Sequence, residues 1–316
     1  MFDVHESTAE HPSPQDAVTP SVPVTAGVDI GGTRVKVVLR QGAGVVGRHV
    51  EPTPADVGAR VGEVVAQAVE RLVAADPSLP RPQRVGVVVP GLVDEVAGVG
   101  VWAANLGWAD LDLRATVARA VGTDVVIGHD VRAGLLGEHL LGAARGVDDV
   151  LFVPLGTGVA IALMSGGRVV HGTTWSGELG HVRVDPDGLE CGCGRRGCLE
   201  TVVGARAVAR RWQAAGREGD ARAVAEAVGG ADPLASQIWH AAVDTLAGAL
   251  AAVVAAAGGR RVVVGGGMAE AGPVLLDPLR AALTARVPDP ALEVVRAELG
   301  EWAGAIGAAH LVPVGS

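Results

Sequence analysis

The sequence contains no tyrosine and a single lysine, Lys36, so every other side chain that is positively charged at pH 7 is an arginine, with histidine taken as neutral. Valine and alanine are abundant instead, a usage typical of GC-rich codons that indicates no function. No apolar run approaches the roughly 20 residues that span a bilayer, and even 246–257 is a short alanine-rich stretch. The first residues have neither a basic region nor an apolar core, so no signal peptide is expected. We therefore expect a cytoplasmic protein without a membrane partner.

Basic charge is also scarce, because 26 lysines and arginines face 35 aspartates and glutamates, for a net charge of −9. Binding of nucleic acid through its phosphates needs a basic stripe, so no nucleic-acid partner is expected. Two common phosphate-binding folds are not expected either. The chain has no GxxxxGK[ST] motif, which argues against a P-loop NTPase, and the glycine cluster at Gly265–Gly267, which follows a strand and precedes a helix, lacks the GxGxxG spacing of a dinucleotide-binding fold.

The length of 316 residues is typical of about two domains at ~150 residues each. Residues 1–23 are rich in proline, serine, threonine and acids, and we expect a disordered leader there. Valine-rich strands follow, and a second strand–turn–strand unit at 149–171 repeats the first. This weak internal duplication predicts an α/β fold of two related halves with helices on both faces of each sheet.

Hydrophobic periodicity gives a first map of the elements. The expected strands are 24–30, 35–39, 45–50, 84–89, 124–127, 149–154, 159–164, 168–171, 261–264 and 292–297. The expected helices are 57–75, 111–121, 131–141, 201–215, 220–228, 233–257, 273–286 and 302–312. We expect a small N-terminal domain over 24–127, to which the closing helix adds, and a larger domain over 128–300 that contains an irregular cysteine-rich loop at 178–200.

Three glycine clusters lie at strand ends. In the first, Asp29 precedes a Gly-Gly-Thr turn, and in the second a Gly-Thr-Gly turn again joins two strands. Glycines let backbone N–H groups approach a phosphate, and a strand-end aspartate can hold Mg²⁺ through water. Tight hairpins with a capping aspartate explain the same pattern. The candidate phosphate-binding residues are Asp29, Gly31, Gly32, Thr33, Gly156, Thr157, Gly158, Gly265, Gly266 and Gly267.

The most specific signal is His181 followed by Cys191, Cys193 and Cys198, which are all the cysteines of the chain. Three thiolates and one imidazole complete a closed tetrahedral shell around Zn²⁺, the structural type of site. Reduced cysteines in a turn are one alternative. A disulfide is another, although the odd number of cysteines and the expected compartment disfavour it.

Polar side chains next to these features are candidates for ligand binding. Glu178 and Glu200 flank the cysteine-rich loop, where carboxylates would accept hydrogen bonds from sugar hydroxyls. Asp130 lies at the start of a predicted helix that follows a strand. An aspartate at such a position caps the helix or acts as a general base. Asn105 lies in a loop between two tryptophans. Three roles are open for these rings: part of the core, part of a lid, or a surface on which a sugar ring stacks.

Taken in order, Asp29-Ile-Gly-Gly-Thr33, Asn105-Leu-Gly-Trp108, Asp130, Gly156-Thr-Gly158, Glu178-Leu-Gly-His181 and the cysteine stretch through Glu200 resemble the ROK family of repressors and sugar kinases over about residues 24–312. The resemblance implies an actin/hexokinase-like (ribonuclease H-like) fold with two α/β domains around a cleft, and a homodimer. It also implies ATP-dependent phosphorylation of a hexose at its 6-hydroxyl with Mg²⁺, and a structural Zn²⁺.

Individual roles follow from the same resemblance. Asp130 matches the catalytic base, and the zinc ligands match His181, Cys191, Cys193 and Cys198. The first two glycine turns match the ATP phosphate loops, and Gly265–Gly267 the adenosine side. The sugar-contacting residues implied are Asn105, His129, Asp130, Glu178, His181 and Glu200.

One departure from the family concerns His129, because the kinases usually have asparagine there, against the hydroxyls at carbons 3 and 4. A mispaired polar contact costs about 1–3 kcal/mol. Glucose remains one expected substrate, and kanosamine (3-amino-3-deoxyglucose) is the other. An N-acetylmannosamine or fructose kinase is the alternative within the class. A sugar-responsive regulator is disfavoured, since no helix-turn-helix pattern precedes Asp29. The sequence leaves ATP and polyphosphate open as donors.

Overall fold

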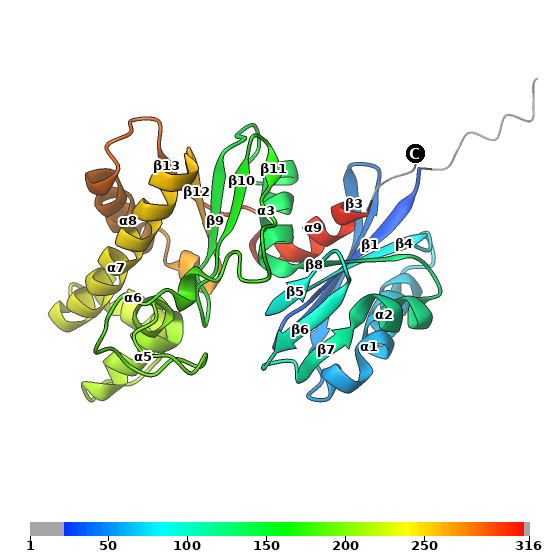
Figure 1. The fold of residues 1–316 in the computed structure, drawn as a ribbon, viewed down its shortest axis with the longest axis horizontal. Helices are drawn as coiled ribbons and strands as arrows, with labels where there is room; N and C mark the ends of the chain where they lie inside the picture. Colours follow the sequence, from blue (N-terminus) through cyan, green and yellow to red (C-terminus); the bar gives the residue numbers. More distant parts are fainter. Residues whose placement is uncertain (1–21, 313–316) are drawn as a thin grey trace, which may run out of the picture.

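The valine-rich start of the chain forms a five-stranded sheet in the order β3-β2-β1-β4-β8 (Figure 1). The structure is a computed structural model that describes residues 22–312, so most of the expected leader lies outside the described residues. The strands pair antiparallel from β1 to β3 and parallel from β1 through β4 to β8. Their bounds are β1 Val24–Ile30, β2 Arg34–Gln41, β3 Gly44–Pro52, β4 Arg84–Val89 and β8 Val125–His129.

A second five-stranded sheet repeats this topology, in the order β11-β10-β9-β12-β13. Its first three strands are again antiparallel, and its last two are again added in parallel. The internal duplication expected from the sequence is therefore visible strand by strand. The bounds are β9 Val150–Pro154, β10 Ala162–Ser165, β11 Arg168–Val169, β12 Arg261–Gly265 and β13 Glu293–Arg296.

Helices cover both faces of both sheets, so the chain has the mixed α/β architecture expected of it (Figure 1). Helices α1 (Val57–Ala75) and α2 (Leu113–Val121) bury their valines on one face of the first sheet. Helices α3 (Asp130–Leu141) and α9 (Ala303–Leu311) lie against each other between the two sheets. The outer face of the second sheet packs against α7 and α8.

Close backbone contact fixes α9 on the first sheet. A Cβ atom on Gly27 of β1 would lie 2.0 Å from the carbonyl oxygen of Ala305, and one on Gly86 of β4 would lie 2.0 Å from that of Ala308. Only glycine fits at such distances. The closing helix of the chain thus rests on the sheet that the first strands build.

The remaining helices belong to the second half of the chain. They are α4 Glu200–Val203, α5 Ala205–Ala214, α6 Ala221–Gly229, α7 Pro233–Ala257 and α8 Pro273–Arg286, with short 3₁₀ turns at Leu179–His181, Gly267–Ala271 and Gly300–Trp302. By length and composition alone, α7 is the one helix of residues 22–312 that could cross a membrane. Ile238, Leu246 and Leu250 of this helix are buried in the core of the second half, as in the core helix of a globular domain.

Sequence periodicity missed a three-stranded sheet of β5 (Leu92–Asp94), β6 (Val99–Ala103) and β7 (Trp108–Asp112). Its strands are only three to five residues long, contain three aspartates, and are partly exposed, so they lack the apolar alternation of a buried strand. Because β7 takes the residues through Asp112, the helix expected from 111 begins at Leu113, where Asp112 caps it by accepting a hydrogen bond from the Ala115 amide.

Three other expected boundaries are corrected. β8 runs on through His129, so that Asp130 follows the strand directly. The helix expected over 201–215 is divided at Gly204, whose extended backbone separates α4 from α5. The strand expected from 159 begins at Ala162, because Val159 makes only an isolated bridge to Leu155 across the second glycine turn.

Candidate active site

The two glycine turns occupy equivalent places, one between β1 and β2 and the other between β9 and β10. In the first turn the Gly31 amide donates to the Arg34 carbonyl over 2.9 Å, and in the second the Gly156 amide donates to the Gly158 carbonyl over 3.0 Å. The third cluster lies beside the second turn, since the Leu155 amide donates to the Gly265 carbonyl over 2.9 Å. The structure thus joins the second and third predicted phosphate-binding clusters.

Asp29 stands at the end of β1, below the first turn. Its carboxylate accepts a hydrogen bond from the Lys36 ammonium over 3.1 Å, and both side chains are largely buried. Burial raises the pKa of Asp29, Lys36 lowers it and the charge of Asp130 raises it, and together these effects bring it to about 6. Asp29 and Asp130 therefore lie close enough for each carboxylate to feel the charge of the other.

Asp130 begins α3 at the carboxyl end of β8. One carboxylate oxygen accepts a hydrogen bond from the Val131 amide over 2.7 Å, and the side chain is 28% exposed, so the other oxygen is open to a ligand. An exposed oxygen on a carboxylate fixed by the backbone is a suitable geometry for a general base.

His129 differs from the other predicted sugar ligands, because its ring points into the protein. The side chain is 5% exposed, its Nδ1 atom accepts a hydrogen bond from the Val131 amide over 3.2 Å, and the ring also hydrogen-bonds the backbone of Gly91. Burial lowers the pKa of His129, which favours the neutral ring. This placement argues against a direct contact between the imidazole and a sugar.

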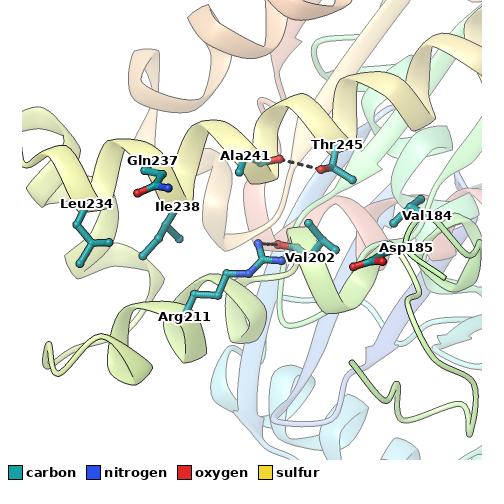
Figure 2. A pocket seen from close by; sticks show the side chains of 9 residues that line it. All are labelled: Val184, Asp185, Val202, Arg211, Leu234, Gln237, Ile238, Ala241 and Thr245. Carbon is teal, nitrogen blue, oxygen red and sulfur yellow. Dashed lines mark hydrogen bonds between the residues drawn. The ribbon is translucent and has the colours of Figure 1, made fainter. Parts of the chain in front are cut away.

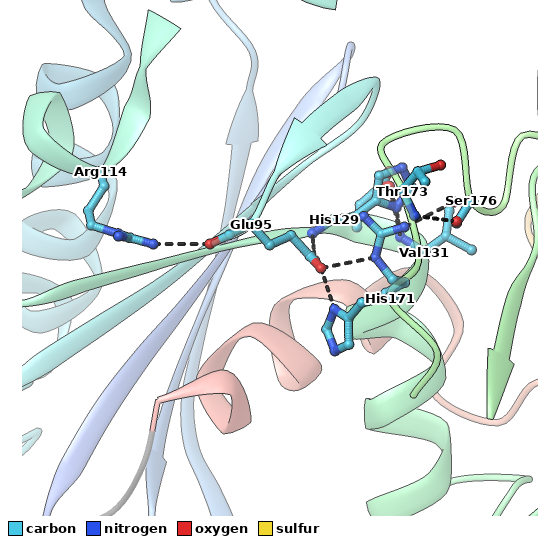
Figure 3. Close-up of polar contacts among 9 residues, drawn as sticks. Glu95, Arg114, His129, Val131, His171, Thr173 and Ser176 are labelled. Atoms are coloured by element: carbon cyan, nitrogen blue, oxygen red, sulfur yellow. Dashed lines mark hydrogen bonds and ion pairs between the residues drawn. The ribbon is translucent and has the colours of Figure 1, made fainter. Parts of the chain in front are cut away.

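Glu95, which the sequence did not single out, forms the centre of a polar network (Figure 3). Its carboxylate accepts a hydrogen bond from the His129 amide over 2.7 Å, lies 3.2 Å from Nε of Arg132, and contacts the His171 ring. Arg132 also donates to the Ser176 carbonyl over 3.0 Å. The network joins the end of β8 to the segment that leads to Glu178.

Opposing effects act on the Glu95 carboxyl group. Burial works to raise its pKa, but the hydrogen bond with His171, the charge of Arg132 and the bond from the His129 amide outweigh burial and lower it. Glu95 is therefore ionised at neutral pH, and the strand end and the following loop are ordered around its charge.

Glu178 and Glu200 bring two further carboxyl groups to the site. Burial raises the pKa of Glu178, and the charges of Asp130 and Glu200 act in the same direction. With the opposite effect of Arg132 included, the pKa of Glu178 is about 7. Glu200 reaches the second phosphate turn, where a Cβ atom on Gly158 would lie 2.1 Å from its Oε2 atom. The Asn105 side chain meets the first turn, since its Nδ2 atom lies 3.0 Å from where a Cβ on Gly32 would be.

The cysteine-rich loop brings His181 and the three cysteines together. One ligand atom of each lies within 4.8 Å of the others. Cys191 Sγ is 3.5 Å from His181 Nδ1, and Cys193 Sγ is 3.7 Å from Cys198 Sγ. In a tetrahedron with Zn–S of about 2.3 Å, two sulfurs are about 3.8 Å apart and a sulfur and a nitrogen about 3.6 Å. The donor set and its spacing therefore fit Zn²⁺.

Arg195 supports thiolate charge in this loop. Burial works to raise the pKa of Cys193, but hydrogen bonds from the Arg195 backbone and guanidinium outweigh it and lower that pKa to about 7. Arg195 also lies over the Trp175 ring, 5.6 Å from its centroid. Arg196, the next residue along the chain, instead pairs with Glu190 at 3.3 Å.

Two cavities lie in the second half of the chain. The larger, about 900 Å³, contains Thr157 of the second turn and Gly267 of the third cluster, with Arg206, Trp239 and Met268 in its wall. It is large enough for a nucleoside. The smaller, about 440 Å³, lies between α5, α7 and the cysteine-rich loop and is lined by Arg211, Asp185 and aliphatic side chains (Figure 2). It contains none of the predicted site residues.

Two α/β halves of like topology, paired phosphate turns and a strand-end aspartate define the chain as a sugar kinase of the actin/hexokinase-like class. The family model described as "ROK family" matches residues 25–314, and the chain belongs to the ROK family.

Individual relatives agree with the family. A glucokinase of Streptomyces coelicolor is 32% identical over 312 residues, covering 91% of this chain and 97% of that protein. A ROK hexokinase structure from Thermus thermophilus has a TM-score of 0.77 at 34% identity, covering 90% of this chain and 96% of that one. A ROK family glucokinase from Streptomyces griseus, solved in complex with glucose and AMPPNP, has a TM-score of 0.77 at 30% identity, with coverage of 92% and 99%.

A further relative has a different name. The bifunctional enzyme NanE/NanK of Brucella melitensis is 33% identical over 302 residues, which are 94% of this chain and 55% of that protein.

Proposed function

We propose that this sugar kinase transfers the γ-phosphoryl group of ATP to the 6-hydroxyl of a hexose, with Asp130 as the general base. The supporting observation is the position of Asp130 at the end of β8, with an exposed carboxylate oxygen and with Asp29 and Glu178 both within reach of its charge. A base there has the first phosphate turn on one side and the cysteine-rich loop on the other.

The proposed reaction balances as follows. The 6-hydroxyl proton passes to Asp130 as the sugar oxygen bonds to the γ-phosphorus, and the bond from that phosphorus to the bridging oxygen of ADP breaks in line. Backbone N–H groups of the two glycine turns would donate hydrogen bonds to the phosphate oxygens. The cavity beside Thr157 and Gly267 would hold the nucleoside. Exclusion of water from the site would protect ATP from hydrolysis.

Two metal ions are part of the proposal. Asp29 would hold Mg²⁺ through water, and the ion would supply positive charge for the transferred phosphoryl group. Zn²⁺ would be held by His181, Cys191, Cys193 and Cys198, whose spacing fits it. Because this shell is closed, the zinc would fix the loop that carries Glu178 and leads to Glu200.

For the sugar, we propose glucose or a glucose-derived amino sugar, and the charges favour the latter. Asp29, Asp130, Glu178 and Glu200 are four acidic side chains around the site, whereas its two nearby cations are already paired, Lys36 with Asp29 and Arg132 with Glu95. The asparagine that faces carbons 3 and 4 in the family kinases is replaced here by His129, whose ring is buried. An ammonium group at carbon 3, as in kanosamine, would find carboxylates to pair with.

An ADP-release assay with glucose, kanosamine, glucosamine, N-acetylmannosamine and fructose tests this function. We expect kcat/KM to be highest for glucose or kanosamine, with the phosphate on carbon 6 by NMR of the product. A strong preference for glucose over kanosamine contradicts the amino-sugar proposal. Turnover of no hexose contradicts the kinase assignment. A parallel arm with polyphosphate in place of ATP decides the donor.

The alternative within the class is an N-acetylmannosamine kinase, which the similarity to NanE/NanK favours, or a fructose kinase. Highest kcat/KM for one of these sugars would select it. A sugar-responsive regulator without catalysis is the remaining alternative, and binding of hexose without ADP release would indicate it. A cytoplasmic location and a homodimer stay predictions.

A further inference from the structure

Lys36 is the only lysine of the chain, and it lies inside the candidate active site. It is the cross-strand neighbour of Asp29, because the register of β1 and β2 pairs these two residues directly. Their side chains meet at 3.1 Å between Nζ and Oδ2, with 14% of the lysine and 10% of the aspartate side chain exposed. Directly opposed residues on one face of an antiparallel pair interact closely.

The surroundings make the Asp29 carboxylate dependent on this one cation. The other charged groups that act on it are Asp130, at the start of α3, and Glu301, before α9, and both are acidic. Arg34, the nearest other cation on β2, pairs with Glu301 and is 58% exposed. On the α9 side the carboxylate meets Gly304, where a Cβ atom would lie 2.9 Å from Oδ2. Little room is left there for water to replace the lysine.

We propose that Lys36 is a positioning residue for phosphoryl transfer: its ammonium holds Oδ2 of the buried Asp29 carboxylate and so directs the other carboxylate oxygen toward the magnesium ion of the nucleotide. This inference rests on the proposed function, because it gives Asp29 its role there. A lysine is a compact point charge that contacts Oδ2 alone. The planar guanidinium of an arginine tends to bind both oxygens of a carboxylate, which would leave neither of them for the ion.

Because the chain has one lysine, protein grown with [13Cε]lysine gives a single lysine resonance, and its chemical shift reports Lys36 without activity. In the ligand-free protein we expect this resonance to move with an inflection near pH 6, where Asp29 titrates. At pH 7.5 we expect it to move again on addition of Mg²⁺ with ADP. ADP with a chelator and hexose alone are the controls. A resonance unaffected between pH 5 and 8 and by Mg²⁺ with ADP would overturn the proposal.

Enzyme variants give the second test. In Lys36→Met we expect the Mg²⁺ concentration for half-maximal rate to rise about tenfold. The acidic limb of the pH–rate profile should move up by about 1–3 pH units, the usual effect of an adjacent opposite charge. Lys36→Arg should keep the position of the acidic limb and still require more Mg²⁺. KM for the hexose should not change, since Lys36 lies on the phosphate side.

Arg81→Met is the control, because it removes a cation whose pair with Glu70 is exposed and which lies before the start of β4, at the opposite end of the parallel strands from the first glycine turn. It should leave the Mg²⁺ requirement and the pH profile unchanged. Hexose binding by tryptophan fluorescence checks that Lys36→Met is folded.

Failure of this proposal is distinguishable from failure of the function. An active kinase in which Lys36→Met changes neither magnesium requirement nor pH profile contradicts the role of Lys36 alone. An inactive protein whose lysine resonance still responds to pH and to Mg²⁺ with ADP contradicts the proposed hexose reaction and keeps the lysine–aspartate–magnesium assignment.

Discussion

Asp130 combines two properties at one residue, an oxygen fixed by the Val131 amide and a partly exposed carboxylate. Asp130→Asn keeps the shape and the first of these but cannot accept the hydroxyl proton. We expect kcat to fall by about 10²–10⁴-fold, the usual contribution of a general base. The dissociation constant for the hexose, measured by calorimetry, should change little. A variant with wild-type kcat would contradict the assignment of the base.

Glu95→Gln removes the anion from the network around β8 and the Ser176 segment. It leaves Arg132, whose side chain is 6% exposed, without its carboxylate. Loss of one partner of a buried ion pair lowers the free energy of unfolding by about 3 kcal/mol. KM for the hexose should also rise, because the segment before Glu178 is then no longer joined to β8 through Glu95 and Arg132. Urea unfolding at neutral pH measures the first effect and initial rates the second.

The pH dependence of this loss follows from the lowered pKa of Glu95. A carboxyl group with a lowered pKa in the folded protein stabilises it above the ordinary pKa of 4.5, and this contribution disappears as the pH falls through the lowered value. The difference between wild type and Glu95→Gln should therefore be constant near neutral pH and shrink below about pH 4.5. Glu70→Gln, which breaks the exposed pair with Arg81, is the control and should show no such difference.

Among individual residues, the sequence alone indicated those that belong to a recognisable motif, such as the three cysteines with His181 and the glycine turns. It missed Glu95, because nothing in its neighbourhood on the chain marks a residue that meets Arg132 and His171. Lys36 was detectable only through the hairpin register that places it opposite Asp29. His129 was assigned to the sugar by the family resemblance, in which an asparagine at this position contacts the sugar, whereas the ring of this strand residue is buried here.

Among the elements, the cysteine-rich loop is the one that the proposed zinc ion would fix. Backbone hydrogen bonds from Val184 to Gly197 and from Leu199 to Val182 join its two ends, yet it contains only short bridges and one 3₁₀ turn. We expect Cys193→Ser, or removal of zinc by a chelator, to lower the melting temperature and the hexose affinity together, since metal binding contributes folding free energy. Elemental analysis, differential scanning calorimetry and hexose titration measure the three quantities.

Arg196→Ala is the control in the same loop, because its pair with Glu190 is exposed and such pairs contribute about 0–1 kcal/mol. It should retain zinc and hexose affinity. A protein that holds no zinc and binds hexose as tightly as wild type would contradict the role of the metal in fixing the loop.

Helices and strands could be predicted from the sequence where one of their faces, or the whole element, is buried. The helices at 57–75, 233–257 and 273–286 have the expected bounds, because long apolar faces and capping residues mark them. The β5–β7 sheet escaped prediction since its strands are stabilised by mutual pairing and by contacts such as that of Trp108 with Leu113 and Gly100, which no local periodicity records.

On the scale of the whole molecule, α3 and α9 meet through small residues. A Cβ atom on Gly307 would lie 1.8 Å from the Ala133 carbonyl oxygen, and one on Gly137 would lie 2.7 Å from that of Ala303. Gly307→Ala should therefore destabilise the protein by about 1–3 kcal/mol, the range for an overfilled contact. Gly229→Ala, where a Cβ meets nothing within 4 Å, is the control. Equal urea midpoints for the two variants would contradict this contact.

The repeated sheet topology could be foreseen from the two strand–turn–strand units, but the contact between α3 and α9 could not. It joins segments more than 150 residues apart, and its glycines and alanines have no distinctive spacing. Long-range contacts of this kind depend on how the two halves are assembled.

The glycine and alanine seam has a mechanical consequence. Two helices whose facing surfaces are nearly smooth can rotate about one another without side chains being pulled from sockets, unlike helices joined by interlocking leucines. The contact between α3 and α9 would thus allow a small rotation of one half of the chain relative to the other, and the resulting displacement would grow with distance from these two helices.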